Sequence, residues 1–337
     1  MTFLKKKSYL IIVCAVITSV VTVGSFLNYK KSEKDKPKTS AAIAMDTAVS
    51  IKTWGADADA LKKLVMDVDI KLNAFNSESE LCKLNNSGSA EASETVLDIT
   101  SKAVELCEKF SDVDVTSGEL IELWNIGNDK ANVPRDESIK TALKSVGNQN
   151  VEISGKTINL KNNARLNFGA CAKGYTCDLI KNKLDDENAE CAIISFGSSS
   201  LLYGKKPDGT RFKTAVVNPF SPSVNLFTFE TDECFISTSG GYERYFEADG
   251  KKYSHIFDLK TGYPVETDIV SVTVICDSGI MSDVVSTAVY IGGTKKLGEY
   301  LASTDFSVIV VDENKNIYVS DEIKKDVEIL QSEFKLV

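Results

Sequence analysis

The sequence is poor in the residues and spacings that mark common metal and nucleotide sites. Its 337 residues include one histidine, His255, and no pair of cysteines at C-x-x-C spacing. The usual pattern of a structural zinc site is therefore absent. No G-x-G-x-x-G segment occurs either, which removes the fingerprint of a classical dinucleotide-binding fold. The sequence also has no internal repeat and no low-complexity tract.

Positive charge is in short supply as well. Lysine and arginine total 39 against 48 aspartate and glutamate residues, so the net charge is −9. Proteins that bind nucleic acid need a basic surface to neutralise phosphates, and this composition argues against such a partner. A small phosphorylated ligand is still allowed, because one or two cations or a metal ion suffice to bind it.

Cysteines are present but form no recognisable framework. There are eight: Cys14, Cys82, Cys107, Cys171, Cys177, Cys191, Cys234 and Cys276. Cys14 lies in the N-terminal apolar segment, which leaves seven. An odd number at irregular spacing does not predict a disulfide scaffold. We expect these side chains to be free and to pack as small hydrophobic groups.

The N-terminus predicts a membrane segment. Lysines 5–7 precede twenty uncharged residues, Ser8 to Leu27, which is long enough to span a bilayer as a helix. A long signal peptide is the alternative. We divide the chain into an anchor or signal segment (1–28), a lysine-rich flexible linker (29–42) and one domain (43–337). Lysines flank the apolar segment on both sides, so charge alone leaves its orientation open.

Hydrophobic periodicity in the domain predicts an α+β fold. Apolar residues recur at helical spacing over 57–73 and 93–110, and Ser79 is placed to cap a short helix between them. Residues 43–54 alternate as a strand does, and most of the second half consists of short strand-like runs. The segment 282–293 predicts a short helix that ends at two glycines. We therefore expect mainly antiparallel sheets with packed helices, behind one membrane segment.

The stretch LNFGACAKGYTCD, residues 166–178, predicts a strand that turns into a helix at small residues. Free backbone N–H groups at such a turn, together with the helix dipole, favour an anion such as a phosphate. Lys173 falls in the first turn, where an isolated helix would favour an acidic residue. An ordinary strand-to-helix connection with an exposed lysine is the alternative interpretation.

This stretch is one of six motifs that occur together in one family. The other five, in chain order, are AMDT (44–47), DVTSGELIELWNIG (114–127), STSGGYERYF (237–246), HIFDLKTGYP (255–264) and SDVVSTA (282–288). In order and spacing they resemble the FAD:protein FMN transferase (ApbE) family over roughly residues 43–320. The resemblance implies a single ApbE-like α+β domain.

Asp283 and Thr287 stand one helical turn apart, so their side chains share a face. A carboxylate and a hydroxyl suit Mg²⁺ or Ca²⁺, although the same pair also occurs as a structural hydrogen bond. The resemblance implies that both bind Mg²⁺, together with the backbone carbonyl of Ala170. Ser286 is a further candidate ligand.

The resemblance also implies an FAD site. The matching positions are Met45, Phe75, Thr116, Ser117, Gly118, Asn167, Lys173 and His255. Phe75 replaces a common tyrosine and keeps an aromatic face, whereas Asn167 replaces an aspartate and loses its charge. Ser198 and Ser199 replace the second glycine and the polar residue of the family's GG-D turn. Asp178 matches the family's last acid in this stretch, and capping its own helix is the alternative.

The activity implied is transfer of FMN from FAD to a threonine or serine hydroxyl of a partner protein, with release of AMP. Asp283 and His255 are the expected catalytic residues, FAD the substrate and Mg²⁺ the metal. Family habit places the domain outside the cytoplasm, anchored to the cell membrane. The alternatives are a metal-dependent FAD pyrophosphatase that yields FMN and AMP, and a non-catalytic FAD-binding module. The sequence carries no signal for an oligomeric state.

Overall fold

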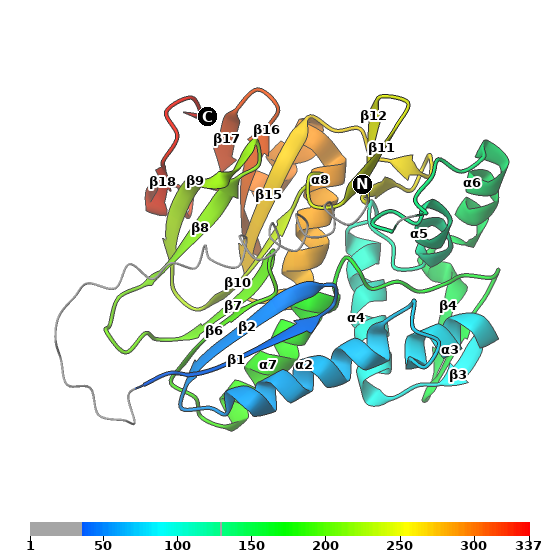
Figure 1. Ribbon diagram of the computed structural model, residues 1–337, viewed down its shortest axis with the longest axis horizontal. Helices are drawn as coiled ribbons and strands as arrows, with labels where there is room; N and C mark the ends of the chain where they lie inside the picture. The colour runs from blue at the N-terminus through cyan, green and yellow to red at the C-terminus, as the bar shows by residue number, and fades with distance from the viewer. Residues whose placement is uncertain (1–35, 129) are drawn as a thin grey trace, which may run out of the picture.

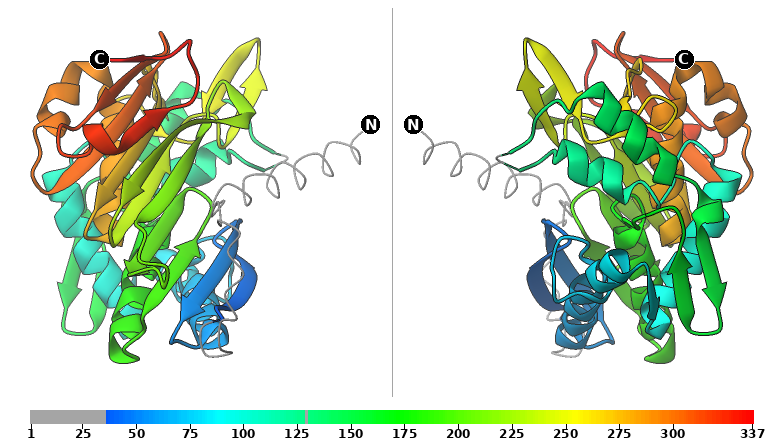
Figure 2. Two further views of the ribbon diagram at one scale, coloured as in Figure 1. Left: turned by 90° about the vertical axis from the view of Figure 1, so that its left-hand side faces the viewer. Right: turned by 90° about the vertical axis from the view of Figure 1, so that its right-hand side faces the viewer.

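The computed structural model describes residues 36–128 and 130–337, and its largest element is a nine-stranded sheet. In spatial order its strands are β1 (Lys38–Ala44), β2 (Thr47–Trp54), β6 (Cys191–Ser195), β7 (Ser199–Gly204), β10 (Cys234–Ser239), β15 (Ile269–Cys276), β16 (Phe306–Asp312), β17 (Asn316–Val319) and β19 (Lys335–Leu336). Neighbours are antiparallel except β17 and β19. Figure 2 shows the β1–β2 hairpin and the C-terminal strands far apart across the molecule.

Both faces of this sheet are covered. In β16, Val308 and Val310 belong to the core on the helical side, whereas Ile309 and Val311 belong to the core on the other side. Successive side chains of a strand point to opposite faces, so a strand covered on both sides is apolar throughout, as VIVV is. A three-stranded sheet covers the second face; it comprises β8 (Phe212–Asn218), β9 (Ser221–Thr231) and β18 (Val327–Ile329).

The helices pack on the first face. The four longest are α2 (Ala58–Leu72), α4 (Glu94–Lys109), α7 (Ala172–Asp186) and α8 (Gly279–Leu301), and α3 (Glu80–Ser87) is short (Figure 1). The helices predicted over 57–73 and 93–110 are confirmed, because their apolar stripes bury Leu61, Val65 and Val68 in one and Val96 and Ile99 in the other. Ser79 caps α3 as predicted, since its hydroxyl accepts a hydrogen bond from the amide of Cys82.

A smaller group of elements forms around Trp124 at one end of the molecule (Figure 1). It contains α5 (Gly118–Trp124), α6 (Asp136–Ala142), β11 (Tyr245–Ala248), β12 (Lys251–Ser254), β13 (Phe257–Asp258) and β14 (Tyr263–Pro264). The indole N–H of Trp124 donates to the carbonyl of Gly262 at 2.9 Å, and the ring is fully buried. This cluster fixes the chain on both sides of His255. The remaining sheet is β3 (Ser89–Glu91), β5 (Thr157–Leu160) and β4 (Val151–Ser154).

The predicted α+β fold of mainly antiparallel sheets and packed helices is confirmed, with two local corrections. The strand predicted over 43–54 is two strands, because Met45 and Asp46 have φ of 50° and 56° and form a tight turn. β1 begins at Lys38, so the linker expected to reach residue 42 ends earlier. The stop predicted at Gly292 and Gly293 is confirmed, because Gly293 has a non-helical φ of 67°; a second helical segment follows it, and α8 comprises both.

The anchor predicted at 1–28 lies outside the described residues. Among residues 36–128 and 130–337, no helix is both long enough and apolar enough to cross a membrane. The cysteine prediction is confirmed for the seven in this range, which are all free and buried. Burial raises the pKa of the Cys107 thiol to about 12, so it stays protonated at neutral pH.

Candidate active site

The predicted central turn is held in place by an asparagine from α3. Asn85 is buried, and its amide group donates to the carbonyl of Leu166 at 2.9 Å and accepts from the Leu166 amide at 2.7 Å. The next residue, Asn167, bonds through its amide to the carbonyl of Val115 at 2.8 Å. Its side-chain oxygen accepts from the Gly169 amide at 2.8 Å, which closes a turn. The backbone that leads to Ala170 is therefore fixed at each step.

Helix α7 starts two residues after Ala170 with no acid in its first turn, as the sequence predicts. Lys173 is half-buried in that turn, and no carboxylate of the described residues forms an ion pair with it. Its charge acts on the ionisation of two side chains from distant segments, His255 and Glu243. The start of α7 therefore combines a helix N-terminus with an unpaired cation, which favours an anionic ligand.

Helices α7 and α8 meet backbone to backbone at two glycines. A Cβ on Gly174 would lie 1.9 Å from the carbonyl oxygen of Gly279, so neither position has room for a side chain. Asp178, one turn along α7, accepts hydrogen bonds from the amides of Gly279 and Ile280 at 2.7 and 2.8 Å. It thus caps α8 rather than its own helix. Burial raises the pKa of this carboxyl above its usual value.

This contact places Asp283 against the first turn of α7. The carboxylate is buried, and its Oδ2 accepts from the Gly174 amide at 2.7 Å. Its Oδ1 accepts from the hydroxyls of Ser199 at 2.8 Å and Ser237 at 2.6 Å. Thr287 lies one turn along α8, and its hydroxyl donates to the carbonyl of Asp283 at 3.2 Å. Asp283 and Thr287 therefore share one face of the helix, as predicted.

Ser286, the further candidate ligand, is engaged in internal hydrogen bonds. Its hydroxyl donates to the carbonyl of Asp283 at 2.9 Å and lies 2.8 Å from that of Ser239. Ser239 also lies 3.4 Å from the Thr287 hydroxyl. Two serines and a threonine therefore share one small network, in which Ser286 is buried and Thr287 is half-buried.

The donor set fits a divalent cation. Asp283 is only 5% exposed, and no lysine, arginine or histidine of the described chain forms an ion pair with it. A buried carboxylate held only by neutral donors is costly unless a cation compensates its charge. The part of the chain that the structure describes holds no cluster of three His, Cys, Asp or Glu residues. A site built here would therefore rest on one carboxylate, one hydroxyl and backbone carbonyls, which are ligands that Mg²⁺ accepts.

His255 is held as a neutral imidazole. Its Nδ1 and its backbone N–H both lie 3.1 Å from the carbonyl of Arg244. A carbonyl only accepts, so Nδ1 carries the proton and Nε2 keeps a free lone pair. Burial, the charge of Arg244 and the charge of Lys173 lower the pKa of His255 to about 4. At neutral pH this residue is therefore a proton acceptor.

Two charged residues beside it were not predicted from the sequence. Enclosure by protein raises the pKa of Glu243 to about 7, although part of its side chain remains exposed. Arg244 forms an ion pair with Asp46 at 3.3 Å, which ties this segment to the β1–β2 turn. Both belong to the motif STSGGYERYF. Spacing along the chain could not show that this motif lies next to the start of α7.

Met45, one of the residues predicted to bind FAD, lies in the turn between β1 and β2. Its amide donates to Asp69 Oδ1 at 2.9 Å, and its sulfur lies 3.7 Å from the hydroxyl of Thr176 in α7. This predicted cofactor-binding residue therefore packs against α7 at Thr176. Phe75 is different: its ring is 60% exposed in the loop after α2. Its role as a stacking surface for flavin stays a prediction.

The turn formed by residues 116–118 makes its hydrogen bonds and packing contacts within the protein. The hydroxyl of Thr116 donates to Asp114 at 2.6 Å and accepts from the Gly147 amide at 2.7 Å. Gly118 packs on the backbone of Arg165, where a Cβ would lie 2.5 Å from the carbonyl oxygen. Thr116 is fully buried, so any contact from this turn to a ligand falls to its neighbours or the main chain.

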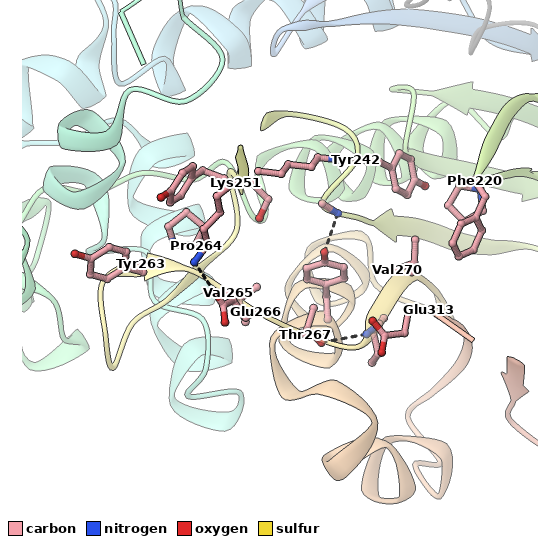
Figure 3. Close-up of a pocket in the computed structure, with 17 residues that line it drawn as sticks. Phe220, Tyr242, Lys251, Tyr263, Pro264, Val265, Glu266, Thr267, Val270 and Glu313 are labelled. Carbon is pink, nitrogen blue, oxygen red and sulfur yellow. Dashed lines mark hydrogen bonds and ion pairs between the residues drawn. The ribbon is translucent and has the colours of Figure 1, made fainter. Parts of the chain in front are cut away.

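A hollow with a volume of about 370 Å³ lies next to this site (Figure 3). Its walls include Gly241, Tyr242 and Ser254, which adjoin Glu243 and His255, and Tyr290, one turn beyond Thr287 on α8. The Gly241 amide donates to the Tyr290 hydroxyl at 3.1 Å. The hollow is lined by residues of two of the motifs, Gly241 and Tyr242 in one and Tyr263 and Pro264 in the other, but by none of the predicted site residues.

Known proteins are similar to this chain in both sequence and fold. The FAD:protein FMN transferase of Vibrio cholerae is 28% identical over 276 residues, which cover 78% of this chain and 82% of that protein. The enzyme of the same name from Salmonella typhimurium is 26% identical over 286 residues, with 79% and 82% covered.

Two solved structures superpose over most of the chain. The ApbE protein of Thermotoga maritima has a TM-score of 0.80 and 27% identity, covering 86% of this chain and 99% of that one. The flavinyl transferase ApbE of Pseudomonas stutzeri, in its apo form, has a TM-score of 0.74 and 25% identity, covering 83% and 92%. Residues 45–310, which hold every site residue described above, match the ApbE family, and the chain therefore belongs to that family.

Proposed function

We propose that this protein is a Mg²⁺-dependent FAD:protein FMN transferase that links FMN through a phosphoester bond to a threonine or serine hydroxyl of a partner protein. Family membership and the names of its relatives support the reaction class. The observation that supports the metal requirement is Asp283 of α8, a buried carboxylate that lies against the first turn of α7 and has no cationic partner among the described residues. Ala170, Asp283 and Thr287 would hold the ion through three oxygen atoms.

In the proposed reaction the acceptor hydroxyl oxygen attacks the FMN phosphorus, and the bond from that phosphorus to the AMP oxygen breaks. AMP leaves with the electron pair of the broken bond. Bound Mg²⁺ would neutralise charge that develops on the phosphates. Lys173 and the amides at the start of α7 orient the pyrophosphate. Nε2 of neutral His255 accepts the proton of the acceptor hydroxyl and passes it to solvent.

The proposal extends to the cellular location of the enzyme and to its acceptor protein. The uncharged segment at residues 8–27 supports an N-terminal membrane anchor, with the catalytic domain outside the cytoplasm. The acceptor is then an extracytoplasmic or membrane protein with an accessible threonine or serine loop. Its hydroxyl has to enter on the side of the phosphate opposite AMP.

The test uses the full-length protein in detergent with FAD, Mg²⁺ and an acceptor domain that carries one reactive threonine. We expect flavin fluorescence that stays with the acceptor after denaturation, and one AMP released for each flavin attached. Asp283→Asn, which keeps the size of the side chain, is expected to lower the rate by two orders of magnitude or more.

The other outcomes identify the alternatives. Free FMN and AMP without labelled acceptor would indicate an FAD pyrophosphatase. FAD binding without any AMP would indicate a binding module, and either result would overturn the transferase proposal.

A further inference from the structure

The hydrogen bonds of Asp283 limit how its carboxylate binds a cation. Oδ1 accepts from Ser199 at 2.8 Å and from Ser237 at 2.6 Å, while Oδ2 accepts from the Gly174 amide at 2.7 Å. A carboxylate has about four lone-pair positions, two on each oxygen. Oδ1 is therefore fully used, and a single position remains, on Oδ2.

The two serine hydroxyls converge because of strand register. Ser199 in β7 and Ser237 in β10 are directly opposite each other in adjacent antiparallel strands, so their side chains lie on the same face of the sheet. Each is 2% exposed, and Ser237 is supported further by Ser282, whose hydroxyl lies 2.7 Å away. Burial shields these hydroxyls from solvent, and together they act as a clamp that holds the Asp283 carboxylate in one orientation.

A carboxylate that can bind a metal through only one of its oxygens suits Mg²⁺ better than Ca²⁺. Ca²⁺ takes six to eight oxygen ligands and commonly binds a carboxylate through both oxygens, whereas Mg²⁺ takes six at shorter distance and keeps waters and substrate phosphates. Asp283 would give one ligand, and Thr287 and Ala170 one each. The rest of the shell is left to phosphate oxygens and water, which is the Mg²⁺ arrangement.

We propose that Ser199 and Ser237 are specificity-determining positioning residues, which hold Asp283 to a single metal-binding oxygen and thereby select Mg²⁺ over Ca²⁺. The inference rests on the metal site of the proposed function. It assigns a role to Ser199, at the turn where the chain departs from its family's motif.

The experiment measures metal affinity directly. Mn²⁺, a paramagnetic substitute for Mg²⁺, is titrated into the full-length protein with FAD and followed by electron paramagnetic resonance, and Mg²⁺ and Ca²⁺ are then added as competitors. The variant Ser199→Ala removes one of the two hydrogen bonds to Asp283 Oδ1, and the double variant Ser199→Ala/Ser237→Ala removes both. We expect Mg²⁺ affinity to fall about 10-fold or more, the usual effect of losing a group that orients a metal ligand. Ca²⁺ affinity should fall less or rise, so that the preference for Mg²⁺ drops about tenfold.

Ser200→Ala is the matched control, because Ser200 follows on the same strand and points to the opposite face of the sheet. It should leave both affinities unchanged. If Ser237→Ala proves unstable by thermal melting, Ser199→Ala alone decides the question. An unchanged Mg²⁺/Ca²⁺ ratio in a folded Ser199→Ala variant overturns the clamp and leaves the transferase intact. Absence of Mn²⁺ binding in the unmodified protein overturns the metal site and the clamp together.

Discussion

The backbones of Gly174 in α7 and Gly279 in α8 are in direct contact: a Cβ on either residue would lie 1.9 or 2.1 Å from the other's carbonyl oxygen. The same contact brings the Gly174 amide to Asp283 and lets Asp178 cap α8. The crossing of these two helices therefore sets the position of the proposed metal ligand relative to the turn that is predicted to bind an anion.

Gly174→Ala is expected to force the helices apart. Overpacking of this kind costs about 1–3 kcal/mol in the free energy of unfolding, measured by chemical denaturation. FAD and metal affinity should fall as well, because the amide at 174 moves away from Asp283. Gly298→Ala is the control, since nothing lies within 4 Å of a Cβ there and alanine favours the helix. Equal stability of the two variants would contradict the role of the glycine contact.

Asn85 is expected to be the main support of the central turn. Asn85→Ala leaves the buried amide and carbonyl of Leu166 without partners, which costs about 2–4 kcal/mol in unfolding free energy. Hydrogen exchange at Leu166 and Asn167 should accelerate and FAD binding should weaken. Asn86→Ala, an exposed neighbour on α3, should change stability by less than about 0.5 kcal/mol. Slow exchange at Leu166 in Asn85→Ala would refute this account.

His255 is expected to stay uncharged far below the usual range. It is the only histidine, so its ring protons can be followed by NMR without ambiguity. We expect a pKa of about 4 in the folded protein, against about 6.5 in the unfolded chain. A midpoint above pH 6 would contradict the buried, neutral imidazole.

The same residue makes stability depend on pH. Between pH 6.5 and about 4 the unfolded chain takes up a proton on His255 and the folded protein does not. The contribution to stability is complete above pH 6.5 and is lost as the pH falls toward 4. His255→Asn lacks this contribution, so its unfolding free energy should decline less steeply over that range. Parallel curves for the two proteins would show that His255 does not titrate differently on folding.

Lys173 is expected to strengthen FAD binding and to lower the pKa of His255. Lys173→Met removes a positive charge that lowers the pKa of His255, so that pKa should rise in the NMR titration. FAD binding should weaken by about tenfold or more, the usual value of a hydrogen bond to a charged group. Lys183→Met is the control, because Lys183 pairs with Glu187 on the surface of the same helix. If both variants bind FAD equally, Lys173 does not contact the phosphates.

Structural features that depend only on residues close together in the sequence could be predicted. The stripes of α2 and α4, the Ser79 cap, the turn from Leu166 into α7, and the shared face of Asp283 and Thr287 all follow from local spacing. Local rules also misled in places. Met45 and Asp46 adopt positive φ without glycine, because tertiary packing outweighs the local preference.

The sequence by itself determined most of the elements, the turn from Leu166 into α7 and, through its motifs, the family. Only the tertiary structure decided which groups surround Asp283 and His255, because these come from segments up to about a hundred residues away. The register of β7 against β10 places Ser199 and Ser237 on one oxygen, and the packing around Trp124 places Arg244 and Glu243 beside His255. Such convergence depends on pairing between distant strands, which the order of residues along one segment does not encode.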